Sequence, residues 1–219
     1  NGMPNVPGDK SISHRSIIIP SISNGTCEIT NILKSADVLH TLEAFKSMGV
    51  CIIEDKKNLV IQGKGLNSLS ESKDPIYLGN SGTSARLLTG LLSAQNFNTV
   101  LKGDKSLSNR PMKRITEPLK KMNAIINTSD GKLPIEIKGR ELISTDIQIK
   151  IHSAQIKSGL ILASLNTTGT TNIIEDNITR DHTEIMLKAF GSKIFVNHED
   201  NKKIISITGK HELKSKNIN

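Results

Sequence analysis

The chain has 219 residues, and its 29 Lys and Arg against 21 Asp and Glu give a formal net charge of +8 at pH 7. Apolar residues make up 36% of it, but with only four Phe, one Tyr and no Trp, the core of one large domain or two small ones has to be aliphatic. The charge would suit an acidic partner, either nucleic acid or a small phosphorylated molecule. Because no Lys/Arg block is interleaved with aromatic residues, the sequence disfavours nucleic acid.

The cysteine spacing and the length of the apolar runs indicate the cellular compartment of the protein. Cys27 and Cys51 each fall in an expected strand, with no C-x-x-C pair and no His cluster at metal spacing, so we expect two buried thiols and no metal site. We find no signal peptide and no apolar run long enough to span a bilayer. The sequence therefore predicts a cytoplasmic protein with no membrane partner.

The first expected helix begins at a turn of the anion-binding type. Residues 7–15 read Pro-Gly-Asp-Lys-Ser-Ile-Ser-His-Arg. Gly8 lets the backbone approach a ligand, and the free N–H groups of a helix N-terminus favour phosphate or carboxylate. Lys10 adds a point charge and Arg15 a planar, two-pronged donor. An ordinary capped surface helix would show the same features. The anion-binding interpretation is therefore supported only because comparable helix starts recur in the rest of the chain.

Two patterns each recur three times along the chain. One is a helix followed by two strands that close on Ile-x-Gly, in residues 37–63, 111–139 and 181–209. The other, upstream of each, is a Ser- and Thr-rich helix start, an aliphatic helix and a Thr-containing strand, in residues 11–30, 81–102 and 153–174. The unit is therefore strand, helix, strand, helix, strand, strand. We expect three such repeats, at about residues 5–66, 75–141 and 145–212, in a single domain spanning residues 1–219.

Units of this kind cannot bury their apolar faces alone, so the repetition predicts pseudo-threefold packing in an α/β domain. Corresponding helix N-termini should then gather at one end. The starts carry Lys10-Ser11, Ser35-Ala36-Asp37, Asn80-Ser81-Gly82-Thr83, Asn109-Arg110-Pro111, Ser153-Ala154-Gln155 and Thr179-Arg180-Asp181. Small polar residues occur there as caps. With Arg15 of the first helix, however, three Arg, one Lys and one Gln gather at one end, which predicts a strongly anionic ligand with more than one acidic group.

Five motifs, in order, resemble the signatures of the 5-enolpyruvylshikimate-3-phosphate synthase family. They are residues 7–15, Leu-Gly-Asn-Ser-Gly-Thr-Ser-Ala-Arg at 78–86, Asn-Arg-Pro-Met at 109–112, Ser-Ala-Gln-Ile-Lys-Ser at 153–158 and Thr-Arg-Asp-His-Thr-Glu at 179–184. The resemblance implies a domain of three βαβαββ units with helices inside and sheets outside. It also implies transfer of the enolpyruvyl group of phosphoenolpyruvate to the 5-hydroxyl of shikimate 3-phosphate, in aromatic amino-acid synthesis, with no cofactor and no essential metal.

The resemblance further implies roles for individual residues. Lys10 would contact both substrates, and Ser11 and Arg15 would hold the shikimate moiety. The 3-phosphate or the ring would be surrounded by Ser153, Ala154, Gln155 and Arg180. The phosphate of phosphoenolpyruvate would be bound by Asn80, Gly82 and Arg110. A glycine at position 82 implies sensitivity to glyphosate, a competitor of phosphoenolpyruvate.

The family has a second domain, which supplies the proton-transferring Asp and Glu, and we expect it to be missing here. The resemblance thus predicts an isolated domain, one half of the enzyme, inactive alone and completed by that second half. His14 and His182 fall near the expected site, but His14 is expected on a helix surface, and Asp181 with Glu184 as caps of a helix.

Two other functions stay open. The UDP-N-acetylglucosamine enolpyruvyl transferase shares the fold, and would be expected to show Ala-Asn after Lys10 and a reactive Cys near Arg110, where Ser11-Ile12 and Asn109 stand instead. A free-standing module that binds phosphorylated metabolites without chemistry would need only the anion site.

Overall fold

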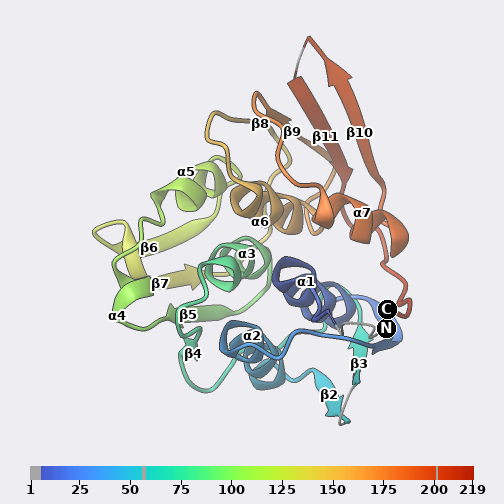
Figure 1. Ribbon diagram of the computed structural model, residues 1–219. Coiled ribbons are helices and arrows are strands. Elements are labelled where there is room, and N and C mark those ends of the chain that lie inside the picture. The colour runs from blue at the N-terminus through green and yellow to red at the C-terminus, as the bar shows by residue number, and fades with distance from the viewer. Residues whose placement is uncertain (1–5, 56–57, 201) are drawn as a thin grey trace.

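The computed structural model describes residues 6–55, 58–200 and 202–219 (Figure 1). The first unit contains α1 (Lys10–Ser21), β1 (Asn24–Ile29), α2 (Ala36–Ser47), β2 (Cys51–Glu54) and β3 (Leu59–Lys64). The second contains β4 (Ile76–Tyr77), α3 (Gly82–Ser93), β5 (Asn98–Lys102), α4 (Lys105–Ser108), α5 (Lys113–Lys121), β6 (Ile125–Ser129) and β7 (Lys132–Lys138). The third contains β8 (Asp146–Ile149), α6 (Ala154–Ser164), β9 (Thr170–Glu175), α7 (His182–Ala189), β10 (Ile194–Glu199) and β11 (Lys202–Thr208).

The sheets of the second and third units have the same topology, β4-β5-β7-β6 and β8-β9-β11-β10. In each, the first pair of strands is parallel and the others are antiparallel. The first unit has the order β1-β3-β2. Beside β1, where the other units have their first strand, lies the end of the chain, with parallel bridges from Asn24 to Lys214 and from Ile29 to Ile218. The sequence places the start of the first unit at about residue 5, and residues 1–5 fall outside the described residues.

Aliphatic helices fill the middle of the molecule, and the three sheets lie around them (Figure 1). Ile17, Ile18 and Ile19 of α1 are completely buried. Helices α3 and α6 pack so closely that a Cβ added to Gly90 would lie 1.9 Å from the carbonyl oxygen of Gly159. Only glycine allows this approach. The predicted fold class, βαβαββ units with helices inside and sheets outside, is confirmed.

The glycine that closes each unit has a packing role. A Cβ on Gly63 would lie 2.1 Å from the carbonyl oxygen of Pro20, one on Gly139 would lie 2.3 Å from that of Phe97, and one on Gly209 would lie 2.2 Å from that of Thr167. In each case the last strand passes directly against the end of the first helix of its own unit or the turn that follows it. The Ile-x-Gly repeat in the sequence therefore marks a close backbone contact.

The structure tests the expected burial of the two cysteines and the expected absence of a membrane span. Cys27 is buried as expected, but Cys51 is exposed, so the prediction of two buried thiols was wrong for Cys51. Strand β2 lies at the edge of its sheet, and most of its side chains face solvent. Across the residues that the structure describes, no helix is both long and apolar enough to cross a membrane.

Candidate functional site

The helix N-termini open on two adjacent hollows. The first hollow, about 330 Å³, is lined by Lys10, Ser11, Asp37, Asn80, Gly82, Thr83, Arg110 and Gln155. The second hollow, about 400 Å³, is lined by His152, Ser153, Ala154, Gln155, Ile178, Thr179 and Arg180. Gln155 lines both. Nine of the ten residues for which the sequence predicted a binding role thus line one hollow or the other, although they come from all three units.

The first helices of the three units differ in whether a side chain caps their N-terminus. Asp9 caps α1 by accepting from the backbone N–H of Ile12 at 2.9 Å, and Ser81 caps α3 by accepting from that of Ser84 at 3.1 Å. Ser153 precedes α6 but makes no side-chain capping bond. Its hydroxyl and the first N–H groups of α6 are therefore available at the second hollow.

The first hollow concentrates positive charge. Lys10 forms an ion pair with Asp37, and Arg110 donates to the side-chain oxygen of Asn80. Arg86 Nη1 donates to the carbonyl oxygen of Gly82 at 3.0 Å and to Gln155 Oε1 at 2.9 Å. Burial, and then the neighbouring charges of Arg110 and Arg114, lower the pKa of Arg86. This arrangement suits an anion that would neutralise the cluster.

Sequence reasoning gave no binding role to three residues of this region. Arg86 stands one turn after Gly82 in the same motif, and its helical spacing of four was the signal that could have placed it here. Asp37 and Thr83 were visible only as helix-start residues. Thr83 accepts a hydrogen bond from Gln155 Nε2 at 3.0 Å and so helps to fix that side chain between the hollows.

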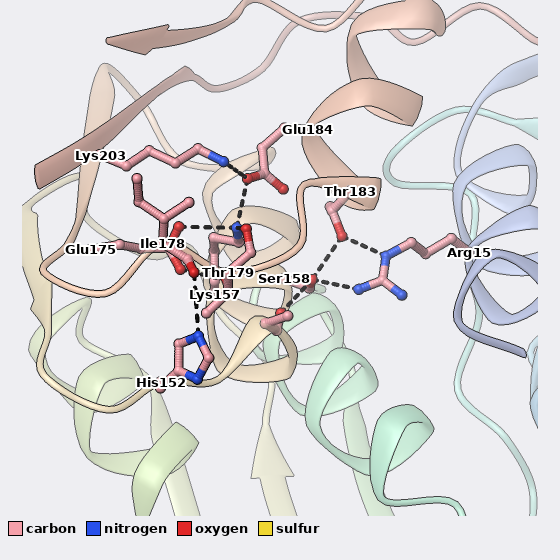
Figure 2. A network of polar contacts seen from close by, with 11 residues as sticks. Arg15, His152, Lys157, Ser158, Glu175, Ile178, Thr179, Thr183, Glu184 and Lys203 are labelled. Atoms are coloured by element: carbon pink, nitrogen blue, oxygen red, sulfur yellow. Dashed lines mark hydrogen bonds and ion pairs between the residues drawn. The ribbon is translucent and has the colours of Figure 1, made fainter. Parts of the chain in front are cut away.

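Arg15 is the predicted binding residue that lines neither hollow. It is 4% exposed, and it donates to the Ser11 carbonyl oxygen at 2.8 Å. It also donates to Thr183 Oγ1 at 2.6 Å and to Ser158 Oγ at 2.7 Å (Figure 2). Burial lowers its pKa to about 10, with Glu184 opposing that shift. In this structure Arg15 joins α1 to α6 and α7.

His14 was expected on a helix surface, and that prediction was wrong. The side chain is completely buried, with Nδ1 2.8 Å from Thr41 Oγ1. Burial, together with the charge of Lys10, lowers the pKa of His14 to about 4, so the ring is neutral near pH 7. It contributes to the packing of α1 against α2 rather than to an exposed face.

The capping role expected for Asp181 and Glu184 was also wrong. Asp181 occupies the N-cap position of α7 but makes no side-chain capping bond. Glu184 is buried and pairs instead with Lys157 at 2.8 Å and Lys203 at 2.9 Å. Glu184 therefore belongs to a buried charge network, whose partners are distant in the sequence and cannot be predicted from a local motif.

The chemistry that these residues offer is anion binding. Asp37 is the one carboxylate among the residues that line the two hollows, and Lys10 neutralises it. Within residues 6–55, 58–200 and 202–219, no group of three or more His, Cys, Asp or Glu side chains could hold a metal ion. Cationic side chains and helix N-termini remain as the binding elements.

Comparisons with known proteins identify the family. The whole chain, residues 1–219, matches the family model of EPSP synthase (3-phosphoshikimate 1-carboxyvinyltransferase). It is 48% identical over 214 residues to the 3-phosphoshikimate 1-carboxyvinyltransferase of Vesicomyosocius okutanii, and 46% identical over 215 residues to that of Geobacter sulfurreducens. These alignments cover 97% of this chain but 48% and 49% of the relatives, so the chain spans about half their length.

A solved structure gives the same result. The EPSP synthase of Acinetobacter baumannii superposes with a TM-score of 0.93 at 46% identity, over 99% of this chain and 48% of that one. A likeness of this extent at this identity covers the sheets, the central helices and the five motifs together. The chain belongs to the EPSP synthase family.

Proposed function

We propose that this chain is the shikimate-3-phosphate-binding part of a 3-phosphoshikimate 1-carboxyvinyltransferase. The complete enzyme would transfer the enolpyruvyl group of phosphoenolpyruvate to the 5-hydroxyl of shikimate 3-phosphate, releasing phosphate, in the cytoplasmic synthesis of aromatic amino acids. The observation that carries the proposal is the pair of adjacent hollows that share Gln155. Two anion-binding hollows side by side fit two phosphorylated substrates that must react with each other.

The proposal divides the substrates between the hollows. Shikimate 3-phosphate would lie in the second hollow, with its phosphate near the N-terminus of α6, Ser153 and Arg180. The phosphate of phosphoenolpyruvate would lie in the first hollow, near Asn80, Gly82 and Arg110. Lys10 would contact both substrates once it exchanges its ion pair with Asp37 for one with a ligand. Glyphosate, as a competitor of phosphoenolpyruvate, would occupy the first hollow.

The described hollows supply binding and electrostatic stabilisation, but the titratable groups that could act as acid or base in them are engaged: Asp37 pairs with Lys10, and His152 Nε2 donates to the carbonyl oxygen of Ile178. Protonating the enol carbon and deprotonating the 5-hydroxyl need groups within hydrogen-bond reach of the reacting atoms. Since Asp37 is already paired with Lys10, we propose that the rest of the enzyme supplies these groups and closes over the site. This chain alone is then inactive, and the proposal requires no cofactor, metal, nucleic acid or membrane.

Titration calorimetry tests the binding role directly. The chain should bind shikimate 3-phosphate at one site, and Ser153→Ala should weaken that binding while the chain stays folded. UDP-N-acetylglucosamine serves as the competing ligand for the other enolpyruvyl transferase, and it should give no heat. Binding of the nucleotide sugar, or no binding of shikimate 3-phosphate, would overturn the proposal.

A phosphate-release assay with both substrates tests the inactivity. The chain alone should release none, and adding the separately expressed remainder of the enzyme should restore release. A chain that binds shikimate 3-phosphate but stays inactive even with the remainder would favour the alternative of a free-standing binding module.

A further inference from the structure

Four buried charged side chains form a network in the third unit, and none of them lines either hollow (Figure 2). Lys157 of α6, Glu175 of β9, Glu184 of α7 and Lys203 of β11 are each at most 4% exposed. Lys157 Nζ lies 3.0 Å from Glu175 Oε2 and 2.8 Å from Glu184 Oε1, and Lys203 Nζ lies 2.9 Å from Glu184 Oε1. Burying charged groups carries a desolvation cost, so apolar residues of similar volume at these four positions would often stabilise the fold equally well. Stability alone therefore does not explain the network, which points to a second role.

The network holds the loop that joins β9 to α7. Lys157 Nζ donates to the carbonyl oxygen of Thr179 at 3.3 Å, and the Thr179 hydroxyl donates to Glu175 Oε1 at 2.5 Å. One residue earlier, the carbonyl oxygen of Ile178 accepts from His152 Nε2 at 3.2 Å (Figure 2). Two consecutive loop residues are thus fixed by side chains, and the strongest of these bonds involve charged groups.

Arg180 follows directly on this fixed segment. On its other side, Thr183 of α7 donates to Ser158 Oγ at 2.7 Å, and Glu184 is tied to Lys157. The Arg180 side chain is exposed and makes no hydrogen bond or ion pair with other residues of the described chain. A free guanidinium at the second hollow is therefore carried by a backbone that is held on both sides.

We propose that Lys157, acting through Glu175 and Thr179, is a positioning residue that sets where Arg180 stands over the second hollow. The inference rests on the proposed function, because it assigns Arg180 to the phosphorylated ligand of that hollow. Its physical basis is preorganisation: a loop held before the ligand arrives loses less conformational freedom on binding, and this raises affinity. Lys157 never touches the ligand.

The first test removes a single hydroxyl. Thr179→Val keeps the shape of the side chain but loses the bond to Glu175, and Thr179→Ser keeps the hydroxyl. By calorimetry, Thr179→Val should raise the Kd for shikimate 3-phosphate about tenfold, as loss of a hydrogen bond to a charged group would, and Thr179→Ser should restore the affinity. The matched control is Thr170→Val at the far end of β9, which should leave the Kd unchanged. Equal Kd values for the Val and Ser variants at position 179 would overturn the inference.

The second test compares two buried lysines that share Glu184. Lys157→Met and Lys203→Met should both lower the thermal stability, but only Lys157→Met removes a bond to the loop. We expect a raised Kd for Lys157→Met and an unchanged Kd for Lys203→Met, measured where both are folded. A network with a purely structural role would give the two variants the same Kd.

Hydrogen–deuterium exchange of residues 176–181, without ligand, separates this inference from the proposed function. Exchange should speed up in Thr179→Val and in Lys157→Met, and stay unchanged in Lys203→Met. If the wild-type chain binds no shikimate 3-phosphate, the proposed function fails, while the exchange result still decides whether Lys157 holds the loop. Unchanged exchange in both Thr179→Val and Lys157→Met would overturn the positioning role.

Discussion

Gly82 lies against Arg110, so that a Cβ built on the glycine would come within 2.8 Å of Arg110 Nη1 and within 2.7 Å of Arg86 Nη1. Real Cβ contacts are longer than this, so a side chain at position 82 has to displace the guanidinium groups of Arg86 and Arg110. Gly82 is also the first residue of α3, where alanine suits a helix better than glycine does.

Gly82→Ala should therefore change ligand binding without lowering stability. In the complete enzyme we expect the inhibition constant for glyphosate to rise at least tenfold, and the KM for phosphoenolpyruvate to rise as well. Binding of shikimate 3-phosphate, measured by calorimetry, provides the internal control and should change less, because the residues proposed for its phosphate, Ser153 and Arg180, line the second hollow. An enzyme that is already insensitive to glyphosate with Gly82 in place would contradict this prediction.

Substitutions at Lys10 and Arg15 should act on different properties, although the sequence motif contains both. The Lys10 side chain is half exposed, so Lys10→Ala should shift the free energy of unfolding by less than about 0.5 kcal/mol. It should weaken binding of shikimate 3-phosphate by about 1.5–3 kcal/mol, as loss of a charged hydrogen-bond partner does. Unchanged affinity would remove Lys10 from the site.

Arg15→Ala should unfold more easily, because three hydrogen bonds, two of them buried, and the packing between α1, α6 and α7 are lost together. We expect a loss of about 3 kcal/mol in urea denaturation. Arg15→Lys serves as the control: it keeps a charge but cannot form the forked contacts, and should recover only part of the stability. Wild-type stability in Arg15→Ala would show that the buried contacts of Arg15 contribute nothing to the fold.

The repeats could be read from the sequence because each unit carries its own local signals. Ile-x-Gly marks the close contact of the last strand with the end of the first helix, and a Ser or Asp residue directly precedes α1, α2, α3, α6 and α7. The surroundings of His14 and Arg15 could not be read in this way. Helix α1 is buried on nearly every side from Ser13 onward. Its sequence therefore has no separate apolar and polar faces from which the burial of a polar residue could be predicted.

The partners of those polar residues lie far away in the chain. Arg15 bonds to Thr183, 168 residues later, and Cys27 to Lys216, 189 residues later. Similarly, the segment that bridges to β1 comes from the end of the chain, where no repeat signal exists. Single-sequence patterns report local preference, and these contacts follow only from the packing of the units on one another.

The pKa of His14, lowered to about 4, makes stability depend on pH. The folded state holds the ring neutral, while the unfolded state takes up a proton near pH 6.5, so the unfolded state binds more protons between these values. The contribution of His14 is complete above about pH 6.5 and is lost as the pH falls toward 4, by roughly 3 kcal/mol in all.

Urea denaturation between pH 7.5 and 4.5 would measure this loss. His14→Asn, whose amide can replace Nδ1 as the partner of Thr41, should show a shallower decline over that interval. Parallel curves for the wild type and the variant would exclude His14 as the cause.

The pairing of the chain end with β1 predicts the reactivity of the two thiols. Cys27 Sγ lies 3.0 Å from the carbonyl oxygen of Lys216, and burial raises the pKa of Cys27 to about 12, whereas Cys51 is exposed. An aromatic disulfide reagent should therefore modify Cys51 alone in the folded chain, since the thiolate is the reactive species.

Deleting residues 213–219 removes the segment that covers Cys27, together with Leu213, which is completely buried. The deletion should lower the Tm by several degrees, because the loss of a buried leucine alone typically costs about 2–5 kcal/mol. It should also make a second thiol reactive. Repeating the labelling in a Cys51→Ser background isolates Cys27: the intact chain should then stay unlabelled and the shortened chain should react. Rapid labelling of Cys27 in the intact chain would show that the segment does not protect β1 in solution.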